Sequence, residues 1–345
     1  MRASAPVLEV TGLTVTYSRG FRRPPLIAVS DVSFTVGRGE TVSSVGESGS
    51  GKTTIGSAVL GLQPVAKGNI LLNGVDIARL SRPERRPFRE TLQAVFQDPF
   101  SSLDPTKTIG DAVGEPLQVA GPKLTAGEVR RRAAEALGRV GLDPSVMSRF
   151  PAEFSGGQRQ RIAIARALIL KPEIVVCDEA VSALDVSVQA QVLNLLESLQ
   201  REEGVSYIFI SHNMAAVRHI SDRIVVLYRG RVMEEGSAEE VCDRPAHPYT
   251  RSLLASVPLP DVRAQRERRR VRGLTVAASR AGVMPETGCP FAPRCPFAAD
   301  VCTTEPPPLV EAGAGRLVAC ARIAEIPPAD AYASLSGTHE GDGAQ

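Results

Sequence analysis

Residues 46–53, GESGSGKT, constrain this chain more than any other segment. Glycines stand at the first and sixth positions, Lys52 and Thr53 follow, and the segment lies between a β-rich run and a helical pattern. Glycine is needed because side chains would keep main-chain amides from wrapping phosphate oxygens, and the next helix adds its positive N-terminal end. The pattern predicts a nucleoside triphosphate site where Lys52 holds the β and γ phosphates and Thr53 ligates Mg²⁺; a plain glycine turn is the alternative. Further contacts are expected from Gly46, Ser48, Gly49, Gly51 and Thr54.

Two adjacent carboxylates end an apolar strand later in the chain. Residues 174–177 read Ile-Val-Val-Cys, and Asp178 and Glu179 follow them. Acids at the end of a buried strand are costly unless a cation or substrate uses them. We therefore predict that Asp178 binds in the Mg²⁺ shell and that Glu179 orients and deprotonates an attacking water. Taken alone, such a pair is also typical of a helix N-cap beside a surface acid.

Charge and hydropathy narrow the class of protein. The chain has 345 residues, with 40 basic and 38 acidic side chains, and 43% of its residues are hydrophobic. This composition is typical of a globular protein of about two folding units. A near-neutral charge argues against a general nucleic-acid binder, and neither a bilayer-spanning apolar run nor a secretory signal is visible. We therefore expect a cytoplasmic protein with no nucleic-acid partner.

Alternating strand and helix patterns predict the architecture. Short β-rich runs fill the first third of the chain, with a hairpin turn expected at Asn73-Gly74. Residues 109–169 are helical and rich in Ala and Arg, and strand and helix then alternate again. This order predicts an α/β fold with a largely parallel sheet, an antiparallel β-subdomain and an inserted helical subdomain over about 98–170. The expected strands are residues 7–10, 13–17, 32–36, 40–45, 174–177, 206–210 and 223–228.

Residues 154–161, FSGGQRQR, complete a set of ordered motifs. They precede the strand that bears Asp178, and they resemble the signature motif of the ATP-binding subunits of ABC transporters. Further elements of that family occur in order along the chain: Tyr17, Gln97, the SALD segment at 182–185, and His212 after the run YIFIS. Taken alone, Tyr17 is more typical of a strand aromatic, Gln97 of a polar loop residue and His212 of a helix cap. Together they make residues 7–250 similar to this family.

The resemblance implies a P-loop ABC ATPase core whose nucleotide sites are shared between two subunits. In such a site Tyr17 stacks on adenine, Gln97 touches Mg²⁺ and senses the membrane subunit, and His212 contacts the γ phosphate. The signature caps the nucleotide of the opposite subunit, because a helix N-terminus presents partial positive charge to an anion. The residues implied at that contact are Ser155, Gly156, Gly157, Gln158 and, in the dimer-contact loop, Asp185. Catalysis is assigned to Glu179, His212 and Lys52.

Longer phrases point to one branch of the family. VFQDPFSSLDP, CDEAVSALDVSVQAQV, SDRIVVLYRGRVMEEG and RPAHPYTRSLL resemble the oligopeptide/dipeptide importer branch, which includes nickel importers, and its F-type subunit in particular. The implied assembly contains this ATPase at the cytoplasmic face of the membrane, a homologous ATPase, two transmembrane permease subunits and an extracytoplasmic solute-binding protein. The branch favours a paralogue as the second ATPase. Nickel or another small solute is the alternative cargo, and a soluble ATPase acting on ribosomes or DNA is a third interpretation. Ala180 and Ser43-Ser44 depart from the usual pattern without removing a catalytic group.

Periodicity fades past about residue 240. We therefore predict an ATP-binding domain over 1–240 and a small Cys-rich C-terminal extension over 241–345, with a linker at about 258–288. Residues 263–272 of that linker hold six Arg and one Glu. Such a run is typical of a solvated linker, and a contact with anionic lipid head groups is the alternative.

Four of the six cysteines, Cys289, Cys295, Cys302 and Cys320, lie in this extension. Four thiolates can hold zinc or an iron-sulfur cluster, and a reducing cytoplasm disfavours disulfides. The family resemblance favours a [4Fe-4S] cluster, which could make the ATPase redox-responsive, while zinc and unligated thiols stay open as alternatives. Cys177 and Cys242 are interpreted as packing residues.

Overall fold

The computed structural model describes residues 5–20, 23–98, 102–120, 123–256, 287–313 and 315–327. The Arg-rich stretch at 263–272 and all but the last two residues of the expected linker therefore lie outside the described residues. Within the described part of the chain, no helix combines the length and the apolar character needed to cross a bilayer.

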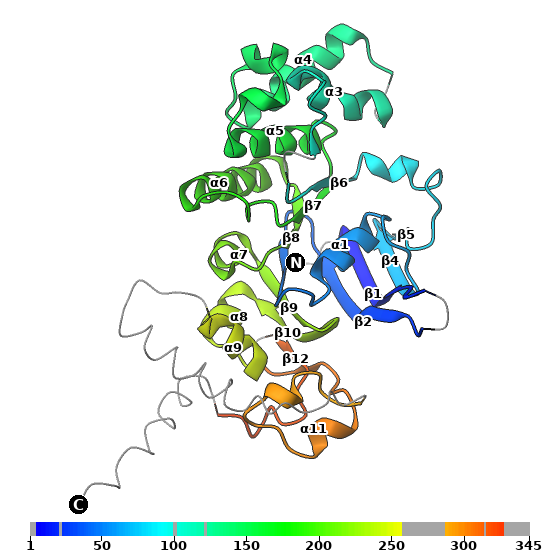
Figure 1. Cartoon of the computed structure of the whole chain (residues 1–345), viewed down its shortest axis with the longest axis vertical. Helices are drawn as coiled ribbons and strands as arrows, with labels where there is room; N and C mark the ends of the chain where they lie inside the picture. Colours follow the sequence, from blue (N-terminus) through cyan, green and yellow to red (C-terminus); the bar gives the residue numbers. More distant parts are fainter. Residues whose placement is uncertain are drawn as a thin grey trace, which may run out of the picture.

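An eight-stranded sheet, counted over the described residues, forms the centre of the molecule (Figure 1). Its order is β11-β12-β10-β9-β3-β8-β7-β6. The five strands from β9 to β6 run parallel, whereas β10, β12 and β11 run antiparallel to their neighbours. The strands are β3 (Thr41–Val45), β6 (Leu92–Val95), β7 (Ile174–Asp178), β8 (Ser206–Ile210), β9 (Arg223–Tyr228), β10 (Arg231–Ser237), β11 (Val310–Glu311) and β12 (Leu317–Val318).

A second, four-stranded sheet is antiparallel, in the order β2-β1-β4-β5. Its strands are β1 (Leu8–Tyr17), β2 (Leu26–Val36), β4 (Lys67–Leu72) and β5 (Val75–Asp76). The predicted hairpin turn is confirmed, since Asn73 and Gly74 both have positive φ, 49° and 79°. The two strands expected at 7–10 and 13–17 are in fact one strand, because Gly12 (φ 60°) accommodates a register shift that leaves the pairing intact on both sides.

Helices cover the main sheet and form a separate group at one end of the molecule (Figure 1). Helices α3, α4 and α5 pack against one another in the region where an inserted helical subdomain is expected. The helices are α1 (Lys52–Val59), α3 (Ile109–Val119), α4 (Ala126–Arg139), α5 (Gly156–Leu168), α6 (Val186–Glu203), α7 (Met214–Ile220), α8 (Ala238–Asp243), α9 (Pro248–Ala255) and α11 (Val301–Thr304). The predicted α/β class, with its antiparallel sheet and helical insertion, is confirmed.

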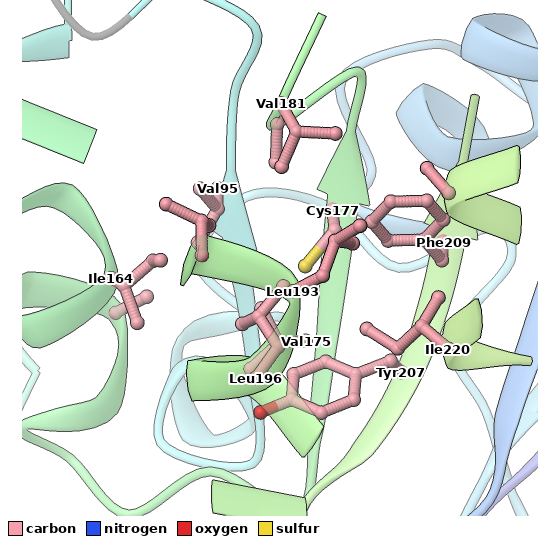
Figure 2. Packing of buried hydrophobic residues seen from close by; sticks show 14 of the residues in the cluster. Val95, Ile164, Val175, Cys177, Val181, Leu193, Leu196, Tyr207, Phe209 and Ile220 are labelled. Carbon is pink, nitrogen blue, oxygen red and sulfur yellow. The ribbon is translucent and has the colours of Figure 1, made fainter. Parts of the chain in front are cut away.

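The central strands are buried on both faces, because alternate side chains enter two different cores. On β7, Val175 and Cys177 pack into a core with α6 and α7, while Ile174 and Val176 face a second core with α1 and the antiparallel sheet. Figure 2 shows the first core, in which Leu193, Leu196, Tyr207 and Phe209 surround the fully buried Cys177. The apolar runs that predicted these strands thus reflect burial on both sides, and β7 and β8 end together at one edge of the sheet.

The C-terminal segment joins the main sheet and packs on its end. Strand β12 pairs with β10, with Glu234 opposite Val318, and residues 287–327 lie at the end of the molecule away from α3 and α4 (Figure 1). Helix α9 was not expected from the sequence. It forms because Tyr249, 0% exposed, packs against Tyr228 and Phe291 with ring centroids 4.5 and 5.4 Å apart. Tertiary contacts therefore fix a helix whose own pattern is weak.

Candidate nucleotide site

The phosphate loop connects β3 to α1, and its glycines are required by close backbone contacts. Gly46 has φ 153°, and a Cβ there would lie 2.1 Å from the carbonyl oxygen of Leu227. Gly51 has φ 103°, and a Cβ there would lie 2.7 Å from the carbonyl oxygen of Ala28. Any side chain at either position would therefore displace backbone. Ser48 and Gly49, at the tip of the loop, are exposed.

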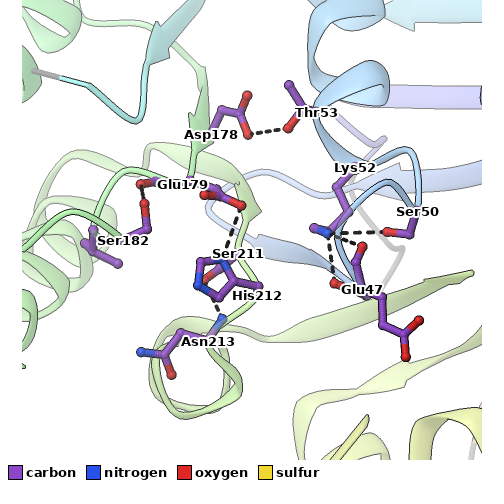
Figure 3. A network of polar contacts seen from close by, with 12 residues as sticks. Glu47, Ser50, Lys52, Thr53, Asp178, Glu179, Ser182, Ser211, His212 and Asn213 are labelled. Carbon is purple, nitrogen blue, oxygen red and sulfur yellow. Dashed lines mark hydrogen bonds and ion pairs between the residues drawn. The ribbon is translucent and has the colours of Figure 1, made fainter.

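Lys52 folds back on the loop. Its Nζ donates to the carbonyl oxygens of Gly46 and Glu47 at 2.8 and 2.9 Å and to Ser50 Oγ at 3.3 Å (Figure 3). Burial lowers the pKa of Lys52, and the nearby carboxylates, of which Glu179 acts most strongly, oppose that shift. A triphosphate would replace the loop carbonyls with oxygens of full negative charge, which suits a buried ammonium.

Asp178 and Thr53 meet at the end of β7. The Thr53 hydroxyl donates to Asp178 Oδ1 at 3.1 Å. Burial raises the pKa of Asp178, an effect that the Thr53 hydrogen bond and Lys52 only partly offset. The Asp178 carboxylate, whose negative charge is only partly compensated, and the Thr53 hydroxyl are the hard oxygen ligands that Mg²⁺ accepts. The residues present therefore fit Mg²⁺.

Glu179 and His212 face each other across two neighbouring strand ends (Figure 3). His212 Nδ1 lies 3.2 Å from Glu179 Oε1. Glu179 has φ 48°, which is a strained backbone conformation. Two hydrogen bonds hold it: the Glu179 N–H donates to the Ile210 carbonyl at 2.9 Å, and Ser182 Oγ donates to the Glu179 carbonyl at 2.9 Å. The backbone thus aims this carboxylate at the edge of the sheet, where a base could reach a water molecule.

Tyr17 and Gln97 border the same site. The Tyr17 hydroxyl lies 3.3 Å from Thr54 Oγ1, at the first turn of α1. Gln97 is exposed and follows β6, whose Val95 pairs with Cys177, so that Gln97 reaches the sheet edge that carries Asp178. The structure thus gathers most of the predicted site residues around the phosphate loop.

The signature segment lies elsewhere, at the N-terminus of α5 in the helical group, apart from α1 (Figure 1). Ser155 caps this helix, accepting from the Gln158 N–H at 3.4 Å, while Gln158 Oε1 accepts from the Ser155 N–H at 3.0 Å. A Cβ on Gly157 would lie 2.3 Å from Val188, and a Cβ on Gly156 would lie 3.5 Å from Leu184. Asp185 caps α6 beside them, accepting from the Val188 N–H at 3.0 Å. Within one chain, these residues and the phosphate loop are two separate sites.

The four C-terminal cysteines line one small cavity of about 20 Å³, together with Phe291 and His247. All six cysteines of the chain are free of disulfides. Among the described residues, no group of three or more His, Cys, Asp or Glu side chains is close enough to hold a metal ion. The cavity has room for about one water molecule. The donor set therefore suits a cluster, whereas the space between the thiols does not.

The sequence analysis did not identify Arg294 and Tyr249, two residues of the C-terminal region that bind Glu47 of the loop. The carboxylate of Glu47, inside the loop, pairs with Arg294, and the Glu47 N–H donates to the Tyr249 hydroxyl at 2.8 Å. Two features of the sequence could have indicated the pair: Glu47 is an acidic residue inside a phosphate-binding pattern, and Arg294 lies between Cys289 and Cys295. The partners are 247 positions apart, so neither signal identified the other.

Known proteins resemble this chain over nearly its full length. Residues 29–182 match the ABC transporter family, and residues 233–302 match the oligopeptide/dipeptide transporter C-terminal region. A Brucella ovis protein described as a peptide import ATP-binding protein is 49% identical over 317 residues, which cover 92% of this chain and 98% of that protein. The oligopeptide transport ATP-binding protein OppF of Haemophilus influenzae is 44% identical over 324 residues, with 92% and 97% covered.

A solved structure agrees with the fold. The ATP-binding cassette MJ0796, in a dimeric post-hydrolysis state bound to ADP and phosphate, superposes with a TM-score of 0.61 and 30% identity, covering 67% of this chain and 98% of that one. The remaining third of this chain leaves room for the separate match at the C-terminal region. The chain therefore belongs to the ATP-binding subunits of ABC transporters, in the branch that carries the oligopeptide/dipeptide transporter C-terminal region, and it is an ATPase that uses ATP and Mg²⁺.

Proposed function

We propose that this chain is the F-type ATPase subunit of a peptide importer. The observation that carries the proposal is the grouping of Lys52, Asp178, Glu179 and His212 at one sheet edge, in a chain whose C-terminal region matches that of oligopeptide/dipeptide transporters. Relatives at 44–49% identity are named for peptide import or oligopeptide transport.

Each residue has a proposed task at the nucleotide. Lys52 and the loop amides bind the phosphates, and Tyr17 stacks on adenine. Glu179 accepts the proton of the attacking water, and His212, which contacts the Glu179 carboxylate in the free chain, turns to the γ phosphate. Thr53, Gln97 and Asp178 would hold Mg²⁺, which neutralises charge that develops on the phosphate oxygens.

A single chain supplies only half of each site. The exposed start of α5 carries Ser155 and Gly157 at a helix N-terminus, which suits an anion, yet it lies apart from the chain's own phosphate loop (Figure 1). We infer that it caps the nucleotide of a homologous ATPase subunit and that Asp185 lies at this contact. The dimeric state of MJ0796 supports such an arrangement.

The wider assembly follows from the branch. We propose that residues 1–240 bind and hydrolyse ATP, that the helical subdomain at about 98–170 passes closure to two transmembrane permease subunits, and that residues 241–345 form the extension, with a linker at about 258–288. In this arrangement the chain lies at the cytoplasmic face of the membrane, and an extracytoplasmic binding protein delivers the solute.

Isolation of the intact complex tests this function. The tagged chain, purified in mild detergent, should bring along a paralogous ATPase and two transmembrane chains identified by mass spectrometry. In liposomes, a binding protein loaded with peptide should raise the rate of ATP hydrolysis several-fold, whereas nickel should not. A complex without transmembrane chains, or stimulation by nickel alone, would contradict peptide import.

We further propose that the four C-terminal cysteines bind a [4Fe-4S] cluster. The proposal rests on four thiols lining one cavity, and it requires these four cysteines to move apart around the cluster, because the cavity is only about 20 Å³. Protein purified anaerobically should then contain iron and sulfide in equal amounts and absorb visible light. Cys295→Ser should lose the absorbance, and Cys242→Ser, outside the cavity, should keep it. Zinc or no metal in the unsubstituted protein would refute the cluster.

A further inference from the structure

A carboxylate in the phosphate loop opposes the ligand that the loop binds. Glu47 is the second residue of the loop, next to Gly46, and its side chain is 43% exposed. Its backbone carbonyl accepts from Lys52 Nζ at 2.9 Å, so the residue borders the place where phosphates are expected, while its carboxylate points away from Lys52 (Figure 3). An unpaired negative charge there would repel a triphosphate. Some group must cancel it if ATP is to bind well.

Arg294 supplies that positive charge. Its two terminal nitrogens donate to the two carboxylate oxygens of Glu47 at 2.8 and 2.9 Å, a bidentate geometry that fixes both side chains. The guanidinium also lies over the rings of Tyr228 and Phe291, 5.8 and 5.6 Å from their centroids. The hydrogen bonds to Glu47 raise the pKa of Arg294, so the guanidinium stays charged.

The segment that carries Arg294 belongs to the C-terminal region and is held by backbone hydrogen bonds and aromatic packing. The 3-10 turn η4 (Ala292–Arg294) lies between Cys289 and Cys295, and the Arg294 N–H donates to the Phe291 carbonyl at 2.9 Å. Phe291 is fully buried, and its ring packs edge-on against Tyr228 at 5.4 Å. The orientation of Arg294 is thus set by the cysteine-flanked turn and by packing on β9.

The same region also holds the loop backbone. Tyr249, buried on α9, accepts a hydrogen bond from the Glu47 N–H at 2.8 Å. Side chain and main chain of Glu47 are therefore both bound by residues more than 200 positions away. An N–H bound to Tyr249 is committed to the protein, which keeps this first turn of the loop in one conformation.

We propose that Arg294 is a positioning residue for ATP binding: it cancels the charge of Glu47 and, with Tyr249, fixes the phosphate loop, so that the C-terminal region sets the ATP affinity of its own subunit. The proposal rests on the proposed use of residues 46–53 to bind phosphates. It predicts an effect on the dissociation constant and KM for ATP, with little effect on kcat, because Arg294 does not reach Glu179.

Charge removal tests the proposal in the full chain assembled with its membrane subunits. Arg294→Gln should weaken MgATP binding about threefold to tenfold, the range expected for loss of one partly exposed pair, with kcat within about twofold of the unsubstituted protein. Glu47→Gln removes the charge that needs cancelling, so the double variant should bind ATP better than Arg294→Gln alone. Higher ionic strength should shrink the Arg294→Gln defect, which a purely structural role would not predict.

Matched variants make the result decisive. Arg218→Gln removes another partly exposed arginine, paired with Asp243, and should leave ATP affinity unchanged. Arg294→Lys keeps the charge and should recover most of the affinity, which also covers the case in which Arg294→Gln folds poorly. Unchanged affinity in Arg294→Gln, additive effects in the double variant, or equal defects in the Lys and Gln variants would each overturn the proposal. If Lys52→Ala also binds ATP normally, the proposed phosphate loop itself is wrong.

Discussion

Replacing Glu179 with glutamine should lower the rate of ATP hydrolysis by about a hundredfold or more while ATP still binds. The amide keeps the size of the side chain but cannot accept a proton from water. Its backbone is fixed by the Ile210 carbonyl and by Ser182, so the variant should fold normally. Turnover and nucleotide binding would be measured separately on the assembled complex.

A second carboxylate on the approach to the same strand provides the control for this variant. Glu173, just before β7, pairs with Arg38 at the opposite end of the strand from the site, and Glu173→Gln should hydrolyse ATP at the normal rate. ATP should also hold the Glu179→Gln protein in a stable dimer, visible by size-exclusion chromatography. Normal turnover in Glu179→Gln would remove Glu179 from its assigned role.

Replacing Lys52 with alanine should abolish transport by weakening ATP binding about tenfold to a hundredfold. The ammonium makes three hydrogen bonds inside the loop, and each is a position that a phosphate oxygen could take over. Alanine offers neither charge nor donors. The measurements are the dissociation constant for MgATP and solute uptake in reconstituted vesicles.

Lys67, exposed at the start of β4, allows a comparison with the loss of an ordinary lysine. Lys67→Ala should bind ATP and support uptake as the unsubstituted protein does. Solute uptake that survives Lys52→Ala would show that the energy for transport does not come from this loop.

Most features of the fold and of the candidate site that could be predicted from the sequence were predicted from short motifs. The loop at 46–53 and the run that ends in Asp178 and Glu179 each combine a backbone requirement with a chemical one, so sequence alone predicts both the strand and the task. The parallel strands β7, β8 and β9 could be predicted for a similar reason, because burial on two faces leaves continuous apolar runs. The parallel strand β6 was missed, because Gln93 interrupts it and its two middle residues are only half-buried.

Features that depend on distant partners were not predictable. Strand β2 begins with Leu26 and Ile27, which are both exposed and lack the alternation of a half-buried strand, yet Leu26 pairs with Tyr17 on β1. Helix α9 forms through aromatic packing against residues from two other segments. The pairing of Glu47 with Arg294 requires the folded chain to bring the two together, and no local pattern encodes it.

The position of β3 has a consequence for how the protein is made. The strand that leads into the phosphate loop is synthesised early, but its two neighbours in the sheet are β8 and β9, with Thr41 opposite Tyr207 and Val42 opposite Arg223. During translation, β3 therefore stays unpaired until β8 and β9 have emerged from the ribosome. Nascent chains truncated before residue 206 should therefore expose the unpaired backbone of this strand to chaperones.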